Sequence, residues 1–194
     1  MYIGIDLDGT VVDSPMQVVN YVNERLGLNL TIDDFKTYSM EDALPEQYKW
    51  IIDSAFRDPL MWKKVSLIDG AHDTIKRLYD EGHEIYFVTS SLPLNLAKKI
   101  KHLTRNLEFF PKDYVWKHTI NTQNKQLLRL NVMIDDALFN LTGDREYYSL
   151  CIDMPYNQTD EMIPNFTRVK DWSEVYDRIK MVESLLKESE DDCV

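Results

Sequence analysis

Two aspartates two positions apart, Asp6 and Asp8, follow a short apolar run at the start of the chain and precede Gly9. The run over residues 2–5 predicts a buried strand, on which residues two apart point the same way. Gly9 permits a tight turn where this strand ends. Because two close carboxylates repel unless a cation or a proton lies between them, the pair predicts a metal site or an acid–base site.

Two further predicted strands also end in polar residues that suit chemistry. Thr89 and Ser90 follow one apolar run, and Asp135 and Asp136 follow another. Apolar strands that alternate with amphipathic helices indicate a parallel sheet, and ligands bind such sheets beyond the carboxyl ends of the strands. We therefore expect these four residues to share one edge of the sheet with the first aspartate pair.

A lysine in the loop before the last of these strands adds a positive charge to the set. Lys125 lies ten residues before Asp135, in a polar stretch from which it can reach the sheet edge. Four carboxylates suit Mg²⁺, which prefers oxygen ligands and shares them with waters and phosphate oxygens. The lysine would pair with a substrate phosphate, to which Thr89 and Ser90 would add neutral donors. The set predicts a magnesium ion and a small phosphorylated substrate. The alternative for Lys125 is an ordinary solvated lysine, and Lys117 is its nearest rival.

The hydrophobic pattern predicts the elements that must position these side chains. Between the first strand and residue 69 the spacing is helical, and apolar strands then alternate with helices up to the C-terminal region. This order predicts an α/β fold, with a parallel sheet that has helices on both faces, and a small helical cap inserted after the first strand. Helices are predicted from Ser14 to Gly27, after Pro45, over 71–79, over 93–103 and from Asp171 to 186, and strands over 85–88, within 115–120, over 131–134 and over 150–152.

The same pattern divides the chain into three parts. We predict a catalytic core from residues 1–13 and 70–187, a helical cap from residues 14–69, and an acidic tail from residues 188–194. Because the insertion leaves the sheet directly after the first motif, we expect the cap to lie above the same sheet edge. Ser14 is expected to cap the first helix of the insertion.

Composition narrows the functional classes. A chain of 194 residues with 44% hydrophobic residues suits one globular domain, and a net charge of −11 argues against binding a nucleic-acid polymer. The two cysteines, Cys151 and Cys193, predict no disulfide framework and a reducing, cytoplasmic setting. We expect no export signal and no membrane span, because no apolar run approaches ~20 residues. A homodimer stays open.

Taken together, the four separated motifs resemble those of the haloacid dehalogenase-like phosphohydrolases. Asp6-Leu7-Asp8-Gly9-Thr10 comes first, Thr89 ends an apolar strand, Lys125 follows, and Asp135-Asp136 ends another strand. This is the order of motifs in that superfamily, and the match extends over most of the chain.

The resemblance implies a role for each motif. Asp6 would be the nucleophile that attacks phosphorus and forms an aspartyl-phosphate. Asp8 would protonate the leaving alkoxide and then activate the water that cleaves the intermediate. Mg²⁺ would bind Asp6, the main-chain carbonyl of Asp8 and one acid of the pair Asp135 and Asp136, of which Asp135 is favoured. The metal and Lys125 would stabilise charge on the transferring phosphoryl group.

A narrower resemblance is to the cytosolic and mitochondrial 5'(3')-deoxyribonucleotidases. Residues 58–62 and 68–71 match, with equal spacing, the Pro-Gly-Phe-Phe and Ile-Pro-Gly-Ala parts of that family. Three later features also fit: the spacing of Lys125 and Asp135, the pair Tyr156-Asn157, and residues 168–172. This resemblance implies a Mg²⁺-dependent phosphatase that hydrolyses deoxyribonucleoside monophosphates.

Four departures from the family pattern bear on the substrate. Ser14 stands where an aromatic residue often stacks on the base, and Met61 replaces the first phenylalanine of a pair whose second position is Trp62. Ser91 and Ala137 replace a proline and a basic residue. We place Ser14, Met61 and Trp62 in the substrate pocket, with burial in the core as the alternative for Met61 and Trp62. A phosphorylated sugar or other small metabolite is the alternative substrate, and a non-catalytic binding module on this fold is a further alternative.

Overall fold

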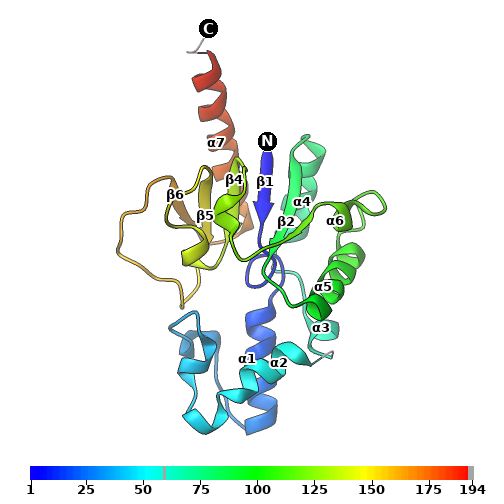
Figure 1. Cartoon of the computed structure of the whole chain (residues 1–194), viewed down its shortest axis with the longest axis vertical. Coiled ribbons are helices and arrows are strands. Elements are labelled where there is room, and N and C mark those ends of the chain that lie inside the picture. Colours follow the sequence, from blue (N-terminus) through cyan, green and yellow to red (C-terminus); the bar gives the residue numbers. More distant parts are fainter. Residues whose placement is uncertain (59, 192–194) are drawn as a thin grey trace.

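The computed structural model describes residues 1–58 and 60–191. Its strands form a parallel sheet with the order β3-β2-β1-β4-β5-β6 (Figure 1). The strands are β1 (Tyr2–Ile5), β2 (Glu84–Thr89), β3 (Thr119–Asn121), β4 (Val132–Asp135), β5 (Tyr148–Ile152) and β6 (Phe166–Val169). Every neighbouring pair is parallel. The predicted α/β fold with a parallel sheet is confirmed, and β6 is a strand that the sequence pattern did not predict.

The predicted helices occur in the predicted order, and an unpredicted short helix over residues 114–117 overlaps the stretch where a strand was expected. The helices are α1 (Ser14–Leu26), α2 (Trp50–Arg57), α3 (Met61–Lys64), α4 (Ala71–Asp80), α5 (Pro93–Asn106), α6 (Tyr114–Lys117) and α7 (Trp172–Asp191). Residues 188–191 of the predicted tail continue α7, and residues 192–194 lie outside the described residues. Across the described ranges, no helix has the length and apolar character needed to cross a membrane.

The two faces of the sheet are covered differently. Alternate strand residues such as Ile5 and Phe87 pack with α4, α5 and α7 in the larger hydrophobic cluster. Residues of the opposite face, including Val88 and Met133, pack in a smaller cluster under the loops around residues 128–147. Those loops contain 3-10 turns where the larger face has α-helices. The central strands are therefore buried on both sides, which holds their carboxyl ends in a fixed relation.

The helical insertion lies beyond the carboxyl ends of the strands (Figure 1). Within it, α1 packs against α2 and α3 around a buried core that includes Val18, Phe35 and Ile51. Two antiparallel segments connect it to the sheet: Ile68 N donates to Val11 O at 2.9 Å, and Asp13 N donates to Ser66 O at 3.0 Å. A small helical insertion after β1 is thus confirmed, whereas the residue boundaries between core and cap stay a prediction.

Helix capping differs from prediction at α1. Asp13 is the N-cap, and its carboxylate accepts a hydrogen bond from Met16 N at 3.2 Å. The expectation that Ser14 caps this helix is wrong, because the Ser14 hydroxyl donates to Asp8 at 2.9 Å. The first turn of α1 is therefore tied directly to the residues that follow β1.

Candidate active site

A tight turn after β1 places Asp6 and Asp8 at the sheet edge. Leu7 O accepts hydrogen bonds from Val11 N at 3.0 Å and from Val12 N at 2.8 Å, which folds the chain back on itself. Gly9 lies in this turn with φ of +73°, a conformation that L side chains rarely adopt. The turn ends the strand, and both aspartates line one cavity at this edge of the sheet.

The turn also packs closely on the loop after β4. A Cβ atom at Gly9 would lie 2.4 Å from Asp136 Oδ2 and 2.9 Å from the Tyr156 hydroxyl. Tyr156 in turn donates a hydrogen bond to Asp136 Oδ2 at 2.6 Å, and Asn157 Nδ2 donates to Asp136 O at 2.8 Å. The absence of a side chain at Gly9 therefore makes room for the Asp136 carboxylate.

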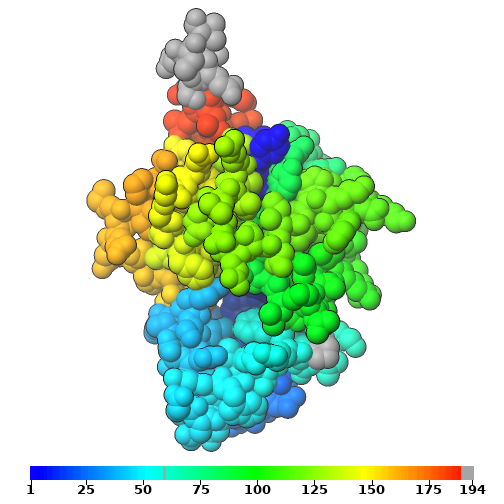
Figure 2. Space-filling model, viewed as in Figure 1, coloured from blue at the N-terminus to red at the C-terminus, as the bar shows by residue number. Residues whose placement is uncertain are grey.

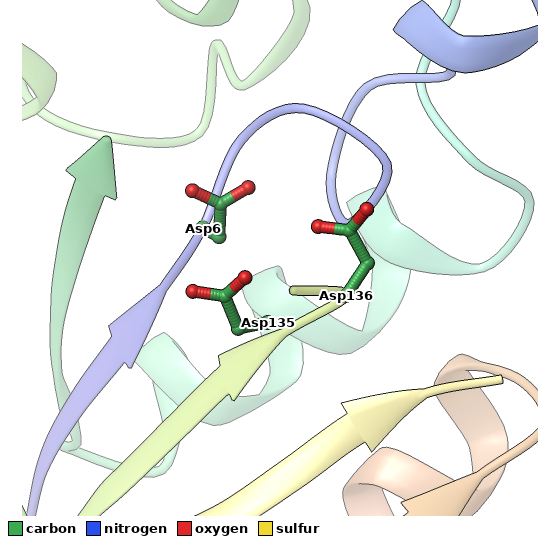
Figure 3. A group of neighbouring side chains, drawn as sticks. All are labelled: Asp6, Asp135 and Asp136. Carbon is green, nitrogen blue, oxygen red and sulfur yellow. The ribbon is translucent and has the colours of Figure 1, made fainter. Parts of the chain in front are cut away.

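Three carboxylates meet where β1 and β4 end (Figure 3). Asp6, Asp135 and Asp136 each offer an oxygen within 4.8 Å of the others, and their exposed fractions are 7%, 0% and 4%. Lys125, from the 3-10 helix Lys125–Leu127, donates to Asp6 and, at 2.7 Å, to Asp135 Oδ2. The ends of β1 and β4 and the lysine are thus brought together as predicted from their order in the sequence.

Burial first, and then an excess of negative over positive charge, shift the pKa values of the acids in this cluster. Burial, reinforced by Asp135 and Asp8 and opposed by Lys125, raises the pKa of Asp6 to about 7. Burial and the carboxylate of Asp6 also raise the pKa of Asp136 well above its usual value. Burial alone would lower the pKa of Lys125, but the carboxylates of Asp6 and Asp135 raise it above its usual value. An additional cation would relieve this repulsion.

The hydrogen bonds distinguish the two acids of the Asp135-Asp136 pair. Asp135 Oδ1 accepts from Ala137 N at 2.9 Å, and Oδ2 accepts from Lys125 and, at 3.1 Å, from Asn140 Nδ2. Asp136 Oδ2 accepts from Tyr156, whereas no described residue donates to Asp136 Oδ1. A buried cluster of carboxylate oxygens, some of them without a donor, fits a hard divalent cation. Asp136 has the freer carboxylate of the two.

Asp8 has partners of its own and lies outside the three-carboxylate cluster. Ser14 donates to Asp8 Oδ1, and Lys99 of α5 donates to Asp8 Oδ2. The sequence analysis missed Lys99. Its position carried a signal, because it lies three residues after Leu96 and four before Leu103, on the apolar face of the helix.

Lys99 links Asp8 to the residues at the end of β2. Its exposed fraction is 5%, and its ammonium group donates to Thr89 Oγ1 at 3.1 Å and to Ser91 Oγ. The same ammonium lies 5.3 Å from the ring centroid of Trp62, within the range of a cation–π contact. Thr89 therefore lies at the site as predicted, and its hydroxyl is already paired with Lys99 and with Ser91 at 3.0 Å.

Two adjoining cavities open between the helical insertion and the sheet edge. The first, which we call the acid cavity, has a volume of about 410 Å³ and is lined by Asp6, Thr89 and Lys125 among others. The second, which we call the cap cavity, has a volume of about 520 Å³. Asp8, Tyr38 and Ser90 line both. Figure 2 shows the hollow between the cyan insertion and the green core, with the blue start of the chain behind it.

The three predicted pocket residues have different positions. Ser14 and Trp62 line the cap cavity. Met61 is buried and lines a separate hollow of about 110 Å³ beside α1, so the structure does not bring it to the site. Pro59, which belongs to the same resemblance segment, lies outside the described residues. Neighbouring positions on α3 thus point to different sides, as expected for successive residues of a helix.

Comparisons with known proteins place the chain among nucleotidases. The family model for the 5' nucleotidase, deoxy (pyrimidine), cytosolic type C protein matches residues 1–186. The 5'(3')-deoxyribonucleotidases of Bacillus subtilis (strain 168) and of Bacillus phage SPbeta are each 26% identical over 177 residues, which cover 89% of this chain and 95% of theirs. A solved HAD family hydrolase from Deinococcus radiodurans R1, with bound phosphate and sodium, has a TM-score of 0.62 at 15% identity and covers 94% of this chain and 96% of its own.

Proposed function

This chain belongs to the 5' nucleotidase, deoxy (pyrimidine), cytosolic type C family of hydrolases, and we propose that it hydrolyses deoxyribonucleoside monophosphates by phosphoryl transfer to Asp6. One observation carries the proposal. The Asp6 carboxylate lines the acid cavity, and in the described part of the chain only one of its oxygens has a donor, which is Lys125. The other oxygen is the candidate nucleophile.

A divalent metal ion is part of the proposal, because the carboxylate cluster has more negative than positive charge. We infer that Asp6, the main-chain carbonyl of Asp8 and Asp136 hold Mg²⁺, and that Asp135 orients Lys125 and the loop after β4. This assignment replaces the earlier preference for Asp135, whose two carboxylate oxygens already accept three hydrogen bonds. When bound, Mg²⁺ stabilises negative charge on the phosphoryl oxygens.

The protein residues then act in two steps. In the first step Asp6 attacks phosphorus, and Asp8 gives a proton to the oxygen of the leaving alcohol. In the second step Asp8 takes a proton from water, which cleaves the aspartyl-phosphate and releases phosphate. Lys99 and Ser14 hold the Asp8 carboxylate from both sides during these transfers. Lys125 and Thr89 line the acid cavity, where they would bind phosphoryl oxygens.

The cap cavity supports a nucleoside as the leaving group. Its volume of about 520 Å³ lies within the range of small-molecule pockets, and its lining includes Phe56, Ile52 and Trp62. A ligand in both cavities would place its phosphate beside Asp6 and its apolar part against these side chains. A phosphorylated sugar would fill less of this space, so we treat it as the second candidate.

A substrate panel tests the proposal. We expect Mg²⁺-dependent release of phosphate from dUMP and dTMP, with slower release from UMP and sugar phosphates, and loss of activity on adding EDTA. Asp6→Asn is the matched control, and it should abolish turnover. Turnover of sugar phosphates without turnover of nucleotides would favour the second candidate. Absence of all phosphatase activity, with ligand binding unchanged by Asp6→Asn, would favour a binding module.

A second variant tests the cap cavity directly. Trp62→Ala should raise KM for a nucleotide more than for a small aryl phosphate, because stacking on a base contributes part of ~1–3 kcal/mol. Trp62 is 5% exposed, so thermal unfolding must show that the variant is folded at the assay temperature. Equal effects on the two substrates would reject stacking as the role of this ring.

A further inference from the structure

Tyr38 is the one residue of the helical insertion that lines the acid cavity, among the residues that the structure describes. The other described lining residues belong to the core, where they end β2 or follow β1, β2, β3 or β4. Tyr38 comes from the loop between the 3-10 helices Ile32–Asp34 and Met40–Ala43, and it also lines the cap cavity. It therefore lies where the two cavities join, and it is contributed by the insertion and not by the core.

Aromatic residues of the core hold the Tyr38 ring in place. Phe139, in the loop after β4, packs edge-on against it at 4.9 Å between ring centroids, with an interplanar angle of 88°. Tyr156 lies at 6.1 Å and 76°. Tyr156 is also the residue whose hydroxyl donates to Asp136 Oδ2. The position of Tyr38 is thus coupled to the same loop that presents Asp136.

The hydroxyl of Tyr38 is available to a ligand. No described residue forms a hydrogen bond with it, and the residue is 53% exposed although its ring contacts two others. Desolvation in the cleft and the carboxylates of Asp136 and Asp6 raise the pKa of Tyr38 above its usual value. The phenol therefore keeps its proton at neutral pH, and its O–H group can donate a hydrogen bond to an anion.

Two core donors that line the acid cavity already have protein partners, so a further donor from the insertion would add to the phosphate site. Lys125 is paired with Asp6 and Asp135, and the Thr89 hydroxyl is shared with Lys99 and Ser91. We propose that the Tyr38 hydroxyl donates a hydrogen bond to a phosphoryl oxygen of the bound substrate. The phosphate site is then completed by the insertion as well as by the core, so that a bound phosphate holds the two together. This inference rests on the proposed function, because it requires a phosphate monoester beside Asp6.

The test uses Tyr38→Phe, which removes the hydroxyl and keeps the ring. We expect kcat/KM for a small aryl phosphate to fall about 10- to 100-fold, the effect of losing one hydrogen bond to a charged group. Competitive inhibition by inorganic phosphate should weaken in the same variant. Tyr48→Phe is the matched control, because Tyr48 is a tyrosine of the insertion that lines neither cavity, and it should stay within about twofold of the wild type.

Two results would overturn the inference. One is an aryl phosphatase activity of Tyr38→Phe within about twofold of wild type, with unchanged inhibition by phosphate. The other is a loss of kcat/KM that is confined to nucleotide substrates, which would mean that the hydroxyl contacts the nucleoside instead of the phosphoryl group. The aryl phosphate separates this inference from the proposed function. If the wild type hydrolyses the aryl phosphate but no nucleotide, the proposed substrate is wrong, and the same comparison still decides the role of Tyr38.

Discussion

Replacing Gly9 by alanine perturbs the contact between the turn after β1 and Asp136 in the loop after β4. The new Cβ would lie 2.4 Å from Asp136 Oδ2, 2.8 Å from Asp136 Cγ and 2.9 Å from the Tyr156 hydroxyl. Non-bonded atoms prefer about 3.5 Å or more, so the turn or the carboxylate must shift by about 1 Å. The hydrogen bonds from Tyr156 and Asn157 resist that shift on the side of Asp136.

Two costs combine in this variant. The left-handed conformation at φ of +73° costs a residue with a side chain about 1–2 kcal/mol, and overpacking costs about 1–3 kcal/mol. We therefore expect the free energy of unfolding to fall by about 2–5 kcal/mol, and the unfolding midpoint by about 4–20 °C for a chain of this size. A displacement of about 1 Å at a reacting centre lowers the rate about 100-fold, so kcat should fall by that order.

Gly82→Ala is the matched control for the backbone. Gly82 has φ of +87°, and its added Cβ would meet no atom within 4 Å. This variant should therefore lose only the conformational part, about 1–2 kcal/mol, and keep its activity. Circular dichroism during heating and phosphate release with saturating Mg²⁺ measure the two effects. The reasoning is refuted if Gly9→Ala unfolds at the same temperature as Gly82→Ala and keeps more than half of the wild-type kcat.

Three further outcomes are expected. Lys99→Met should lower kcat about 10- to 100-fold, because Asp8 loses its cationic partner. The protein should stay folded, because the Asp8 carboxylate is partly exposed to water. Wild-type kcat in this variant would contradict the role of Lys99. Burial raises the pKa of Cys151 to about 12, so iodoacetamide should alkylate this thiol at neutral pH only after denaturation. Peptide mass mapping would detect the modification. Rapid labelling of the native protein would contradict the burial of this thiol. Burial and the N-terminal amino group of Met1 lower the pKa of His83 below its usual 6.5. The unfolded chain therefore binds a proton at this residue more readily than the folded protein does. Stability is lost as the pH falls through about 6.5. Urea unfolding at about pH 5.5 and 7.5 should show a larger increase in stability with pH for the wild type than for His83→Gln, and equal increases would refute this assignment.

The positions of the predicted site residues could be inferred because three of the four motifs lie at strand ends. Asp6, Thr89 and Asp135 follow apolar runs, and parallel strands place their carboxyl ends on one edge of the sheet. The direct contact of Lys125 with Asp6 and Asp135 agrees with the prediction from its spacing. β6 was missed because Phe166–Val169 is a short edge strand with an arginine in it, and periodicity is weak over four residues.

Other features depended on side-chain contacts that were not inferred from the sequence pattern. Ser14 was expected to cap α1, but the turn after β1 brings Asp8 within reach of its hydroxyl. Met61 was expected in the pocket, but α3 turns it toward α1 and leaves Trp62 facing the cap cavity. Lys99 was assigned no role, although its place on the apolar face of a helix predicts burial. A buried cation requires an anionic partner.

The amino-acid sequence by itself determined the parallel α/β fold, the helical insertion and the residues at the sheet edge. Local periodicity and strand-end chemistry suffice for these, because both are set by near neighbours in the chain. Three features were decided only by the tertiary structure. They are which acid of the Asp135-Asp136 pair has a carboxylate oxygen without a described donor, the pairing of Lys99 with Asp8, and the position of Tyr38 at the acid cavity. Each of these contacts joins residues far apart in the sequence, and their geometry depends on how the insertion and three loops pack over one sheet edge.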